Sequence, residues 1–184
     1  MPALRRSAQL GTLLAVLLLA AGCGTTEPAP LKATKPEVPA DLCATVPEAA
    51  RTGLLANANT DTTGNPTAAC SLRSADGAKT KVQAVVTWLQ ANDDTDGEAV
   101  WDSQCQAIDL REFRAQSGFQ AKGADKSCAA TSRTAGADGA TLAAVAGREI
   151  VTVRLTTSPA GTPTSISRGQ QMLEGVLASL AGDS

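Results

Sequence analysis

The sequence predicts an α+β domain: an antiparallel sheet of about five strands, helices packed on one face, and two disulfides. Three observations lead to this fold class. Segments with alternating apolar residues are separated by short turns, residues 163–180 repeat apolar side chains at helical spacing, and four cysteines follow residue 40. Short turns join antiparallel strands, and an amphipathic helix must bury its apolar stripe, here against the sheet.

The body of the domain is predicted to begin near Asp41 with two short helical turns. Leu42, Val46 and Ala50 recur at helical spacing, and Pro47 suits the first position of the second turn. Gly53 ends this region. Residues 57–67 (NANTDTTGNPT) combine turn-forming residues with no hydrophobic pattern, so a loop is predicted there.

A β-hairpin is the clearest local signal. Residues 69–74 lead into Asp76-Gly77, and residues 79–90 (KTKVQAVVTWLQ) then alternate between two faces. Alternation with β-branched residues predicts a strand, and Asp-Gly favours the tight turn between two strands.

The second half predicts one or two helices, three strands and a final helix. Residues 98–106 place Val100, Trp101 and Cys105 on one helical face, and residues 109–114 extend this pattern as a second short helix. A strand opening at Cys128, a turn at residues 137–140, strands over 141–146 and 150–156 and a helix over 163–180 follow.

Composition excludes several kinds of active site. The chain has no histidine and no tyrosine, so Ser-His-Asp and Cys-His catalysis and His-ligated zinc are excluded. Nucleophile, phosphate-binding and dinucleotide-binding motifs are absent from the sequence. With 16 basic and 18 acidic residues, the chain is a poor match for nucleic acid. We expect no enzyme activity, no cofactor and no metal; a cell-envelope hydrolase that uses carboxylates alone is the alternative.

The N-terminus predicts a lipoprotein signal peptide. Arg5 and Arg6 precede a short apolar run over residues 13–21, which is shorter than the roughly 20 residues of a transmembrane helix. The run ends in Ala20-Ala21-Gly22-Cys23, which resembles the bacterial lipobox. The resemblance implies that Cys23 is acylated with fatty acids such as palmitate and becomes the first residue of the mature chain. The alternative is ordinary signal cleavage near Ala21 that leaves Cys23 as a free thiol.

The chain is predicted to divide into a signal peptide (residues 1–22), a lipidated tether (23–40) and one extracytoplasmic domain (41–184). The tether is rich in proline and threonine, so it favours extended conformations that reach roughly 50 Å at about 3.1 Å per residue. Removal of residues 1–22, which contain two arginines and no acid, changes the net charge from −2 to −4. An acidic body is not attracted to an anionic leaflet, so the acyl chains must hold the protein there.

The remaining four cysteines, Cys43, Cys70, Cys105 and Cys128, are predicted to form two disulfides. Four cysteines allow three connectivities, and an exported chain without a C-x-x-C motif favours bonds over metal or redox chemistry. Pairing in sequence order, Cys43 with Cys70 and Cys105 with Cys128, is the favoured arrangement.

Two further patterns favour structural roles. Residues 92–97 partly match a calcium-binding loop, but its twelfth position is Ser103 where a bidentate Glu is needed. Acidic side chains at the start of the following helix are the favoured explanation. Trp88 and Trp101 are predicted to pack in the core, because a stacking platform usually needs several exposed aromatic residues.

The lipobox ending in Cys23, the Pro-rich tether, the Asp41-Leu42-Cys43 start and the Ala69-Cys70-Ser71 segment resemble a family of small actinobacterial lipoproteins. That family is defined by a domain of unknown function. The likeness extends over most of residues 41–180, although the family often has Trp soon after the second cysteine where this chain has Leu72. The resemblance implies a lipid-anchored place on the outer side of the cell membrane, a Cys43–Cys70 bond and an α+β fold, but no activity. We therefore expect a non-catalytic binding or sensing domain, whose partner is an envelope protein or a small ligand.

Overall fold

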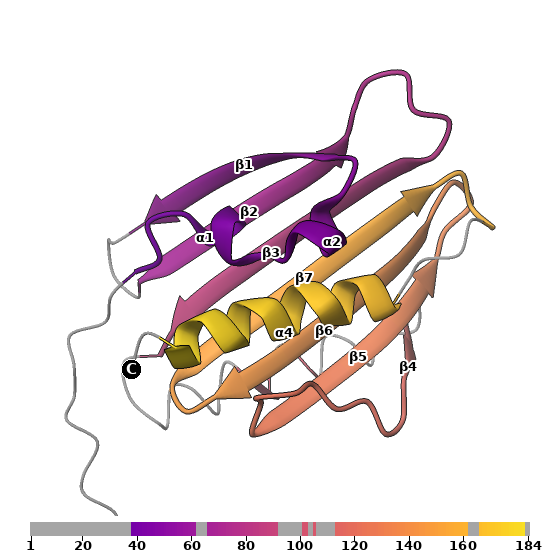
Figure 1. The fold of residues 1–184 in the computed structure, drawn as a ribbon. Coiled ribbons are helices and arrows are strands. Elements are labelled where there is room, and N and C mark those ends of the chain that lie inside the picture. Colours follow the sequence, from indigo (N-terminus) through magenta and orange to yellow (C-terminus); the bar gives the residue numbers. More distant parts are fainter. Residues whose placement is uncertain are drawn as a thin grey trace, which may run out of the picture. The chain divides into compact units, whose positions relative to one another are not determined.

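A computed structural model describes residues 38–61, 66–91, 101–102, 105, 113–161 and 166–182. These residues belong to one compact unit, which spans residues 35–184. Its centre is a seven-stranded antiparallel sheet in the order β1-β2-β3-β7-β6-β5-β4 (Figure 1). The strands are β1 (Leu54–Asp61), β2 (Thr67–Ser74), β3 (Lys81–Gln90), β4 (Phe113–Ala115), β5 (Lys126–Arg133), β6 (Asp138–Ala146) and β7 (Glu149–Ser158).

Helices α1 (Leu42–Thr45), α2 (Glu48–Arg51) and α4 (Ile166–Gly182) lie over one side of this sheet, which we call the inner face (Figure 1). The predicted antiparallel α+β arrangement is confirmed. The number of strands was predicted wrongly, since the sheet has six long strands and the three-residue β4 instead of about five.

The main core fills the space between the inner face and these helices. Cys70, Val86, Val153 and Leu142 occupy matching register positions on β2, β3, β7 and β6, and all four are buried. The predicted stripe of the last helix packs against this surface through Met172, Leu173, Val176 and Leu177. The Asp41 carboxylate begins α1 by accepting hydrogen bonds from the amides of Cys43 and Ala44, at 2.9 and 3.3 Å.

Close approach between α4 and the short helices requires glycine at one position. A Cβ atom added to Gly175 would overlap the Pro47 ring at the start of α2. The Arg168 side chain fastens the same contact, since its Nε donates to the Ala50 carbonyl at 2.6 Å and a terminal nitrogen donates to the Thr52 carbonyl at 2.8 Å. Burial lowers the pKa of Arg168. These contacts fix the two helical turns that the sequence predicted on the inner face.

The opposite side of the sheet, the outer face, carries a smaller apolar cluster. Helical residues Trp101 and Cys105 lie there, packed with Ala143, Val145 and Ile150. The prediction that the helices share one face is therefore wrong for this segment. The physical reason is strand alternation: Cys128 pairs with Ala143, whose side chain points away from the main core, so a bond to Cys128 draws Cys105 to the outer face.

Both disulfides follow the sequence order. Cys43–Cys70 joins α1 to β2 across the inner face, and Cys105–Cys128 joins the Trp101 segment to β5 on the outer face. Each bond encloses a segment of similar length, with sequence separations of 27 and 23 residues.

Three local predictions are corrected by the structure. Residues 54–61 form strand β1, although residues 57–67 were predicted to be a loop. Asp138 and Gly139 lie inside β6, so the predicted turn at residues 137–140 sits too late in the chain. Residues 113–115 form β4, although helix was predicted up to residue 114.

The structure contains no long apolar helix of the kind that crosses a membrane within the residues it describes.

Candidate functional site

The part of the outer face formed by β1, β2, β3 and β7 carries the main candidate site. Asn59, Ala69, Thr87 and Thr152 lie side by side in register across these four strands. Their neighbours two residues along each strand point to the same side. Asp61, Thr67, Leu89 and Ile150 form the row on one side of this line, and Ser71, Val85 and Arg154 lie in the row on the other.

A pocket with a volume of about 410 Å³ lies over these rows. This volume falls within the usual range of small-molecule sites, roughly 300–1,000 Å³. The described lining consists of Asn59, Asp61, Thr67, Ala68, Ala69, Val85, Thr87, Trp88, Leu89, Ile150, Thr152 and Arg154.

The middle of the pocket floor is polar, and its two hydroxyls are bonded to each other. The Thr87 and Thr152 hydroxyls form a hydrogen bond with each other between β3 and β7. Thr152 is buried, and the two side chains face each other in register. The basic side chain of the described lining is Arg154, whose guanidinium only donates hydrogen bonds, so it cannot take the proton of either hydroxyl and turn it into a nucleophile.

Arg154 supplies the positive charge at one end of the pocket. It is the only basic residue among the described lining residues, and its side chain is exposed. Its register partners on the adjacent strands are Val85 and Thr141, so no carboxylate stands directly opposite it. Within the described part of the chain, Arg154 makes no hydrogen bond or ion pair. Its guanidinium gives this end of the pocket a positive charge.

The only acidic residue of the described lining lies at the far corner. Asp61 is three strands away from Arg154 and two rows from it along the strands, one row beyond Thr152. Strand spacing and rise put the two backbone positions about 14 Å apart across the sheet and about 13 Å apart along it. The carboxylate therefore does not neutralise Arg154 directly, and the pocket is polarised from one end to the other.

The apolar lining runs between these charges. Val85 is 38% exposed beside Arg154, whereas Leu89 and Ile150 lie toward the Trp101 cluster. At the edge of the sheet the pocket is bordered by β1, which pairs only with β2 among the described strands and is largely exposed. An edge strand that is open to solvent leaves the pocket accessible from that side.

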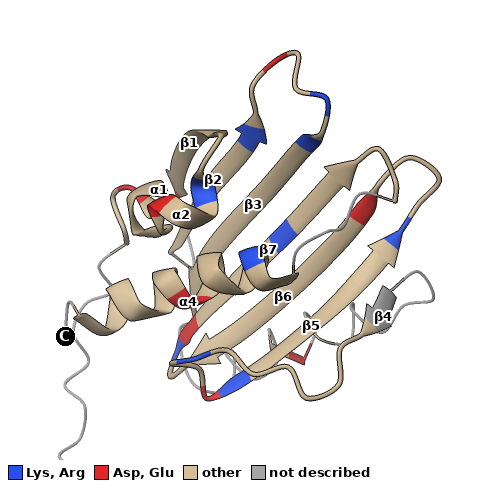
Figure 2. Cartoon of the chain, turned by 45° about the vertical axis from the view of Figure 1, so that its right-hand side comes forward, with Lys and Arg blue, Asp and Glu red and all other residues tan. Residues whose placement is uncertain are grey.

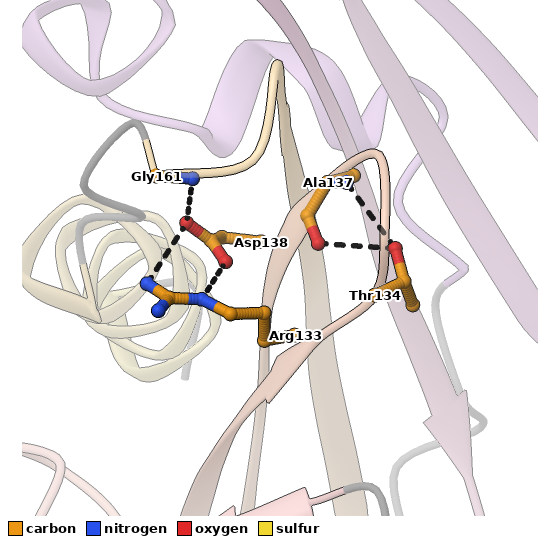
Figure 3. Close-up of polar contacts among 5 residues, drawn as sticks. All are labelled: Arg133, Thr134, Ala137, Asp138 and Gly161. Atoms are coloured by element: carbon orange, nitrogen blue, oxygen red, sulfur yellow. Dashed lines mark hydrogen bonds and ion pairs between the residues drawn. The ribbon is translucent and has the colours of Figure 1, made fainter.

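A separate charged cluster joins the β5–β6 hairpin to the segment after β7 (Figure 3). The Asp138 carboxylate is buried and accepts hydrogen bonds from Arg133 Nε at 2.6 Å and from the Gly161 amide at 2.7 Å. The hydrogen bond from Arg133, followed by the one from Gly161, holds the pKa of Asp138 below its ordinary value. All donors come from the protein itself, so the cluster stabilises the hairpin and offers no vacant position to a ligand.

Other described carboxylates also bond protein donors. Asp125 accepts from the Gly147 amide at 2.7 Å, Glu149 from Trp88 Nε1 at 3.2 Å, and Glu174 from the Lys122 amide at 2.9 Å. Figure 2 shows acidic and basic residues interspersed on the described elements, without one continuous run of either sign. Groups of three or more Cys, Asp or Glu able to hold a metal do not occur among the residues placed by the structure.

The structure places most of the residues singled out by the sequence. The four body cysteines form the two disulfides, and Trp88 and Trp101 are 1% and 9% exposed, as expected for core residues. Cys23 and the acidic residues 93–98 lie outside the described residues.

Sequence reasoning missed the pocket, because its lining depends on which strands are neighbours. β3 and β7 are far apart in the sequence, and their pairing brings Thr87 to Thr152 and Val85 to Arg154. The available signal was the polar residue at every second position from 152 to 156 (Thr152, Arg154 and Thr156), which marked one face of a strand as polar. Comparison with protein-family models, curated proteins and solved structures finds no match for this chain.

Proposed function

We propose that this chain is a lipid-anchored protein on the extracytoplasmic face of the cell membrane, whose body binds a small ligand without chemical turnover. The observation that carries the proposal is the pocket of about 410 Å³ on the outer face, with a hydrogen-bonded threonine pair in its floor and Arg154 at one end.

Cysteine pairing supports the anchor. The sequence contains five cysteines, and four of them are joined in two disulfides. Cys23 is the fifth, and it directly follows the small residues that end the apolar run of a signal peptide. Disulfides are typical of exported proteins, so their presence fits a domain on the outer side of the membrane.

The residues of the pocket support binding over catalysis. General acid–base work by carboxylates alone needs two acidic groups near each other, separated by roughly 5 to 9.5 Å in glycoside hydrolases. The described lining offers only Asp61. The chain has no histidine that could activate either threonine of the floor. A carboxylate-dependent hydrolase therefore finds no support in the described lining of this pocket.

The location of the ligand follows from the tether. A segment of about sixteen residues rich in proline can extend the domain well beyond the lipid headgroups. The ligand or partner is accordingly a component of the envelope and not nucleic acid.

The test is recovery of the ligand from the host. The protein is isolated from cell envelopes, and molecules that remain bound are released and identified by mass spectrometry. Ala69→Phe places a ring beside Thr87 in the middle of the pocket, whereas Gln83→Phe adds the same ring on the outer face beyond the pocket lining. We expect a bound molecule with the unmodified chain and Gln83→Phe, and its loss with Ala69→Phe. Equal recovery from all three, or conversion of the molecule by the purified protein, would overturn the proposal.

A further inference from the structure

We propose that the ligand of this pocket is an amphipathic anion, a small molecule with one carboxylate or phosphate group and an apolar body. This inference rests on the proposed binding function and adds the chemical class of the ligand and the residue that selects it.

The positive charge of Arg154 favours a ligand with a negative charge. Arg154 has Val85 and Thr141 as cross-strand neighbours, so the sheet itself supplies no counter-charge at adjacent positions. An arginine fork binds a carboxylate or a phosphate through two parallel hydrogen bonds. Because the whole chain has a net charge of −2, attraction for an anion is local to this end of the pocket.

The remaining lining determines the body of the ligand. From Arg154 the pocket extends past Val85 and the Thr87–Thr152 pair to Leu89 and Ile150. One of the two hydroxyls donates to the other, so the pair leaves a single hydroxyl donor along this path. Val85 and Leu89 have exposed surface, whereas Ile150 is already buried, so an apolar chain laid over Val85 and Leu89 gains a favourable free energy that scales with the area removed from water.

The same geometry suggests a variant in which the protein's own side chain neutralises Arg154. Val85 stands directly opposite Arg154 on β3 and is 38% exposed, so a longer polar side chain can be accommodated there. Val85→Glu places a carboxylate beside the guanidinium, where cross-strand partners lie about 5 Å apart. The protein then provides its own counter-ion, and an anionic ligand must compete with it.

Octyl probes test the proposal by calorimetry on the full chain carrying Cys23→Ala, a background that keeps acyl chains from the protein's own anchor out of the pocket. Octanoate and octyl phosphate carry the two anionic groups, whereas octan-1-ol and octyltrimethylammonium have the same apolar chain without a negative charge. We expect at least one anion to bind ten times more tightly than either control. The two anions together distinguish a fatty-acid type of ligand from a phosphate ester.

Variants then assign the selectivity to one residue. Arg154→Gln and Val85→Glu should each weaken binding of the preferred anion by at least tenfold. Arg73→Gln is the matched control, since Arg73 is an exposed arginine on β2, two strands away from β7 and outside the described lining of this pocket. It should leave the affinity unchanged within twofold. Melting temperatures of the variants show whether each is folded.

Four results would overturn the inference. Octan-1-ol that binds as tightly as the anions would remove the role of charge, and an equal loss in Arg73→Gln and Arg154→Gln would remove the role of position. If no octyl anion binds while the envelope ligand is still retained and is lost with Ala69→Phe, the chemical class is wrong and the binding function stands. If neither the probes nor an envelope molecule binds, both proposals fail.

Discussion

Removal of the Cys43–Cys70 disulfide provides the most direct test of how this fold is held together. The bond encloses a sequence separation of 27 residues, which contains α2 and all of β1. In the loop-closure model, a bond across a segment of this length raises the free energy of unfolding by about 3.5 kcal/mol at 25 °C. The second bond, with a separation of 23 residues, gives about 3.4 kcal/mol. Loop-closure entropy alone therefore predicts that removal of either bond lowers the free energy of unfolding by almost the same amount.

Packing should separate the two bonds. Cys43 and Cys70 are 4% and 0% exposed and belong to the main core, whereas Cys105 and Cys128 are only partly buried beside the smaller cluster. Replacement of both inner cysteines by alanine also removes two buried sulfur atoms, and the resulting cavity adds about 1–2 kcal/mol. We expect Cys43→Ala/Cys70→Ala to lose about 5 kcal/mol of unfolding free energy, and Cys105→Ala/Cys128→Ala about 3 kcal/mol.

Urea unfolding followed by tryptophan fluorescence measures both losses. Trp88 reports on the main core and Trp101 on the outer cluster. A small domain is stable by only about 5–15 kcal/mol, so a loss of about 5 kcal/mol removes from a third to all of its free energy of unfolding. A loss below 1 kcal/mol for the inner pair, or a larger loss for the outer pair, would refute the reasoning.

Four further predictions follow from the sequence and the structure. Cys23→Ala should move the protein from the membrane fraction to the medium or leave it uncleaved, and stable membrane association in a cell fractionation would contradict lipid attachment. Asp138→Asn should lower the free energy of unfolding at pH 7. The difference in free energy from the unmodified chain should shrink as the pH falls below about 4, because a carboxylate with a lowered pKa stabilises the fold only while it is ionised. A difference that stays constant from pH 7 to pH 3 in urea titrations would argue against this. Gly175→Ala should lose about 1–3 kcal/mol through overlap with Pro47, whereas Gly182→Ala, where the space is open, should not be destabilising in thermal melts. Millimolar calcium or EDTA should leave the melting temperature unchanged, since the segment at 92–103 lacks the bidentate Glu.

Elements whose pattern is set locally were predictable from the sequence. The hairpin of β2 and β3 has strong alternation, and Gly77 in its turn adopts a φ of +83°, a backbone conformation that favours glycine. The final helix was predicted by its apolar stripe, whose central residues Met172, Leu173, Val176 and Leu177 are buried. In both cases one face of an element had to be apolar for the element to be stable, so the sequence carried the signal.

Elements that depend on a distant partner were not predictable in the same way. β1 (LLANANTD) is an edge strand with nearly all residues exposed, so it needs no apolar alternation and is held by pairing with β2. The turn before β6 is closed by the Thr134 hydroxyl, which donates to the Ala137 carbonyl at 3.1 Å, and not by Asp138-Gly139 (Figure 3). Asp138 is instead used by Arg133, its cross-strand partner. Asp76-Gly77 lies in a turn and Asp138-Gly139 lies in a strand, although the two pairs have the same local preference. The tertiary contact of Asp138 decides which structure its pair adopts.

The alternation of strands β3 and β7 separates stability from binding in this protein. Val86 and Val153 point into the main core and are fully buried, whereas Val85 and Arg154, one residue away on the same strands, point to the pocket. A substitution at an inward position changes the packing of the helices. The outward residues Ile150 and Thr152 are also buried, so only the exposed pair Val85 and Arg154 can change the charge or shape of the pocket with little effect on packing. The two disulfides reinforce the division between the faces, because one holds a helix against the inner face and the other holds the Trp101 segment against the outer face. The scaffold can therefore keep its fold while Val85 and Arg154 change, and ligand preference is expected to follow these two residues.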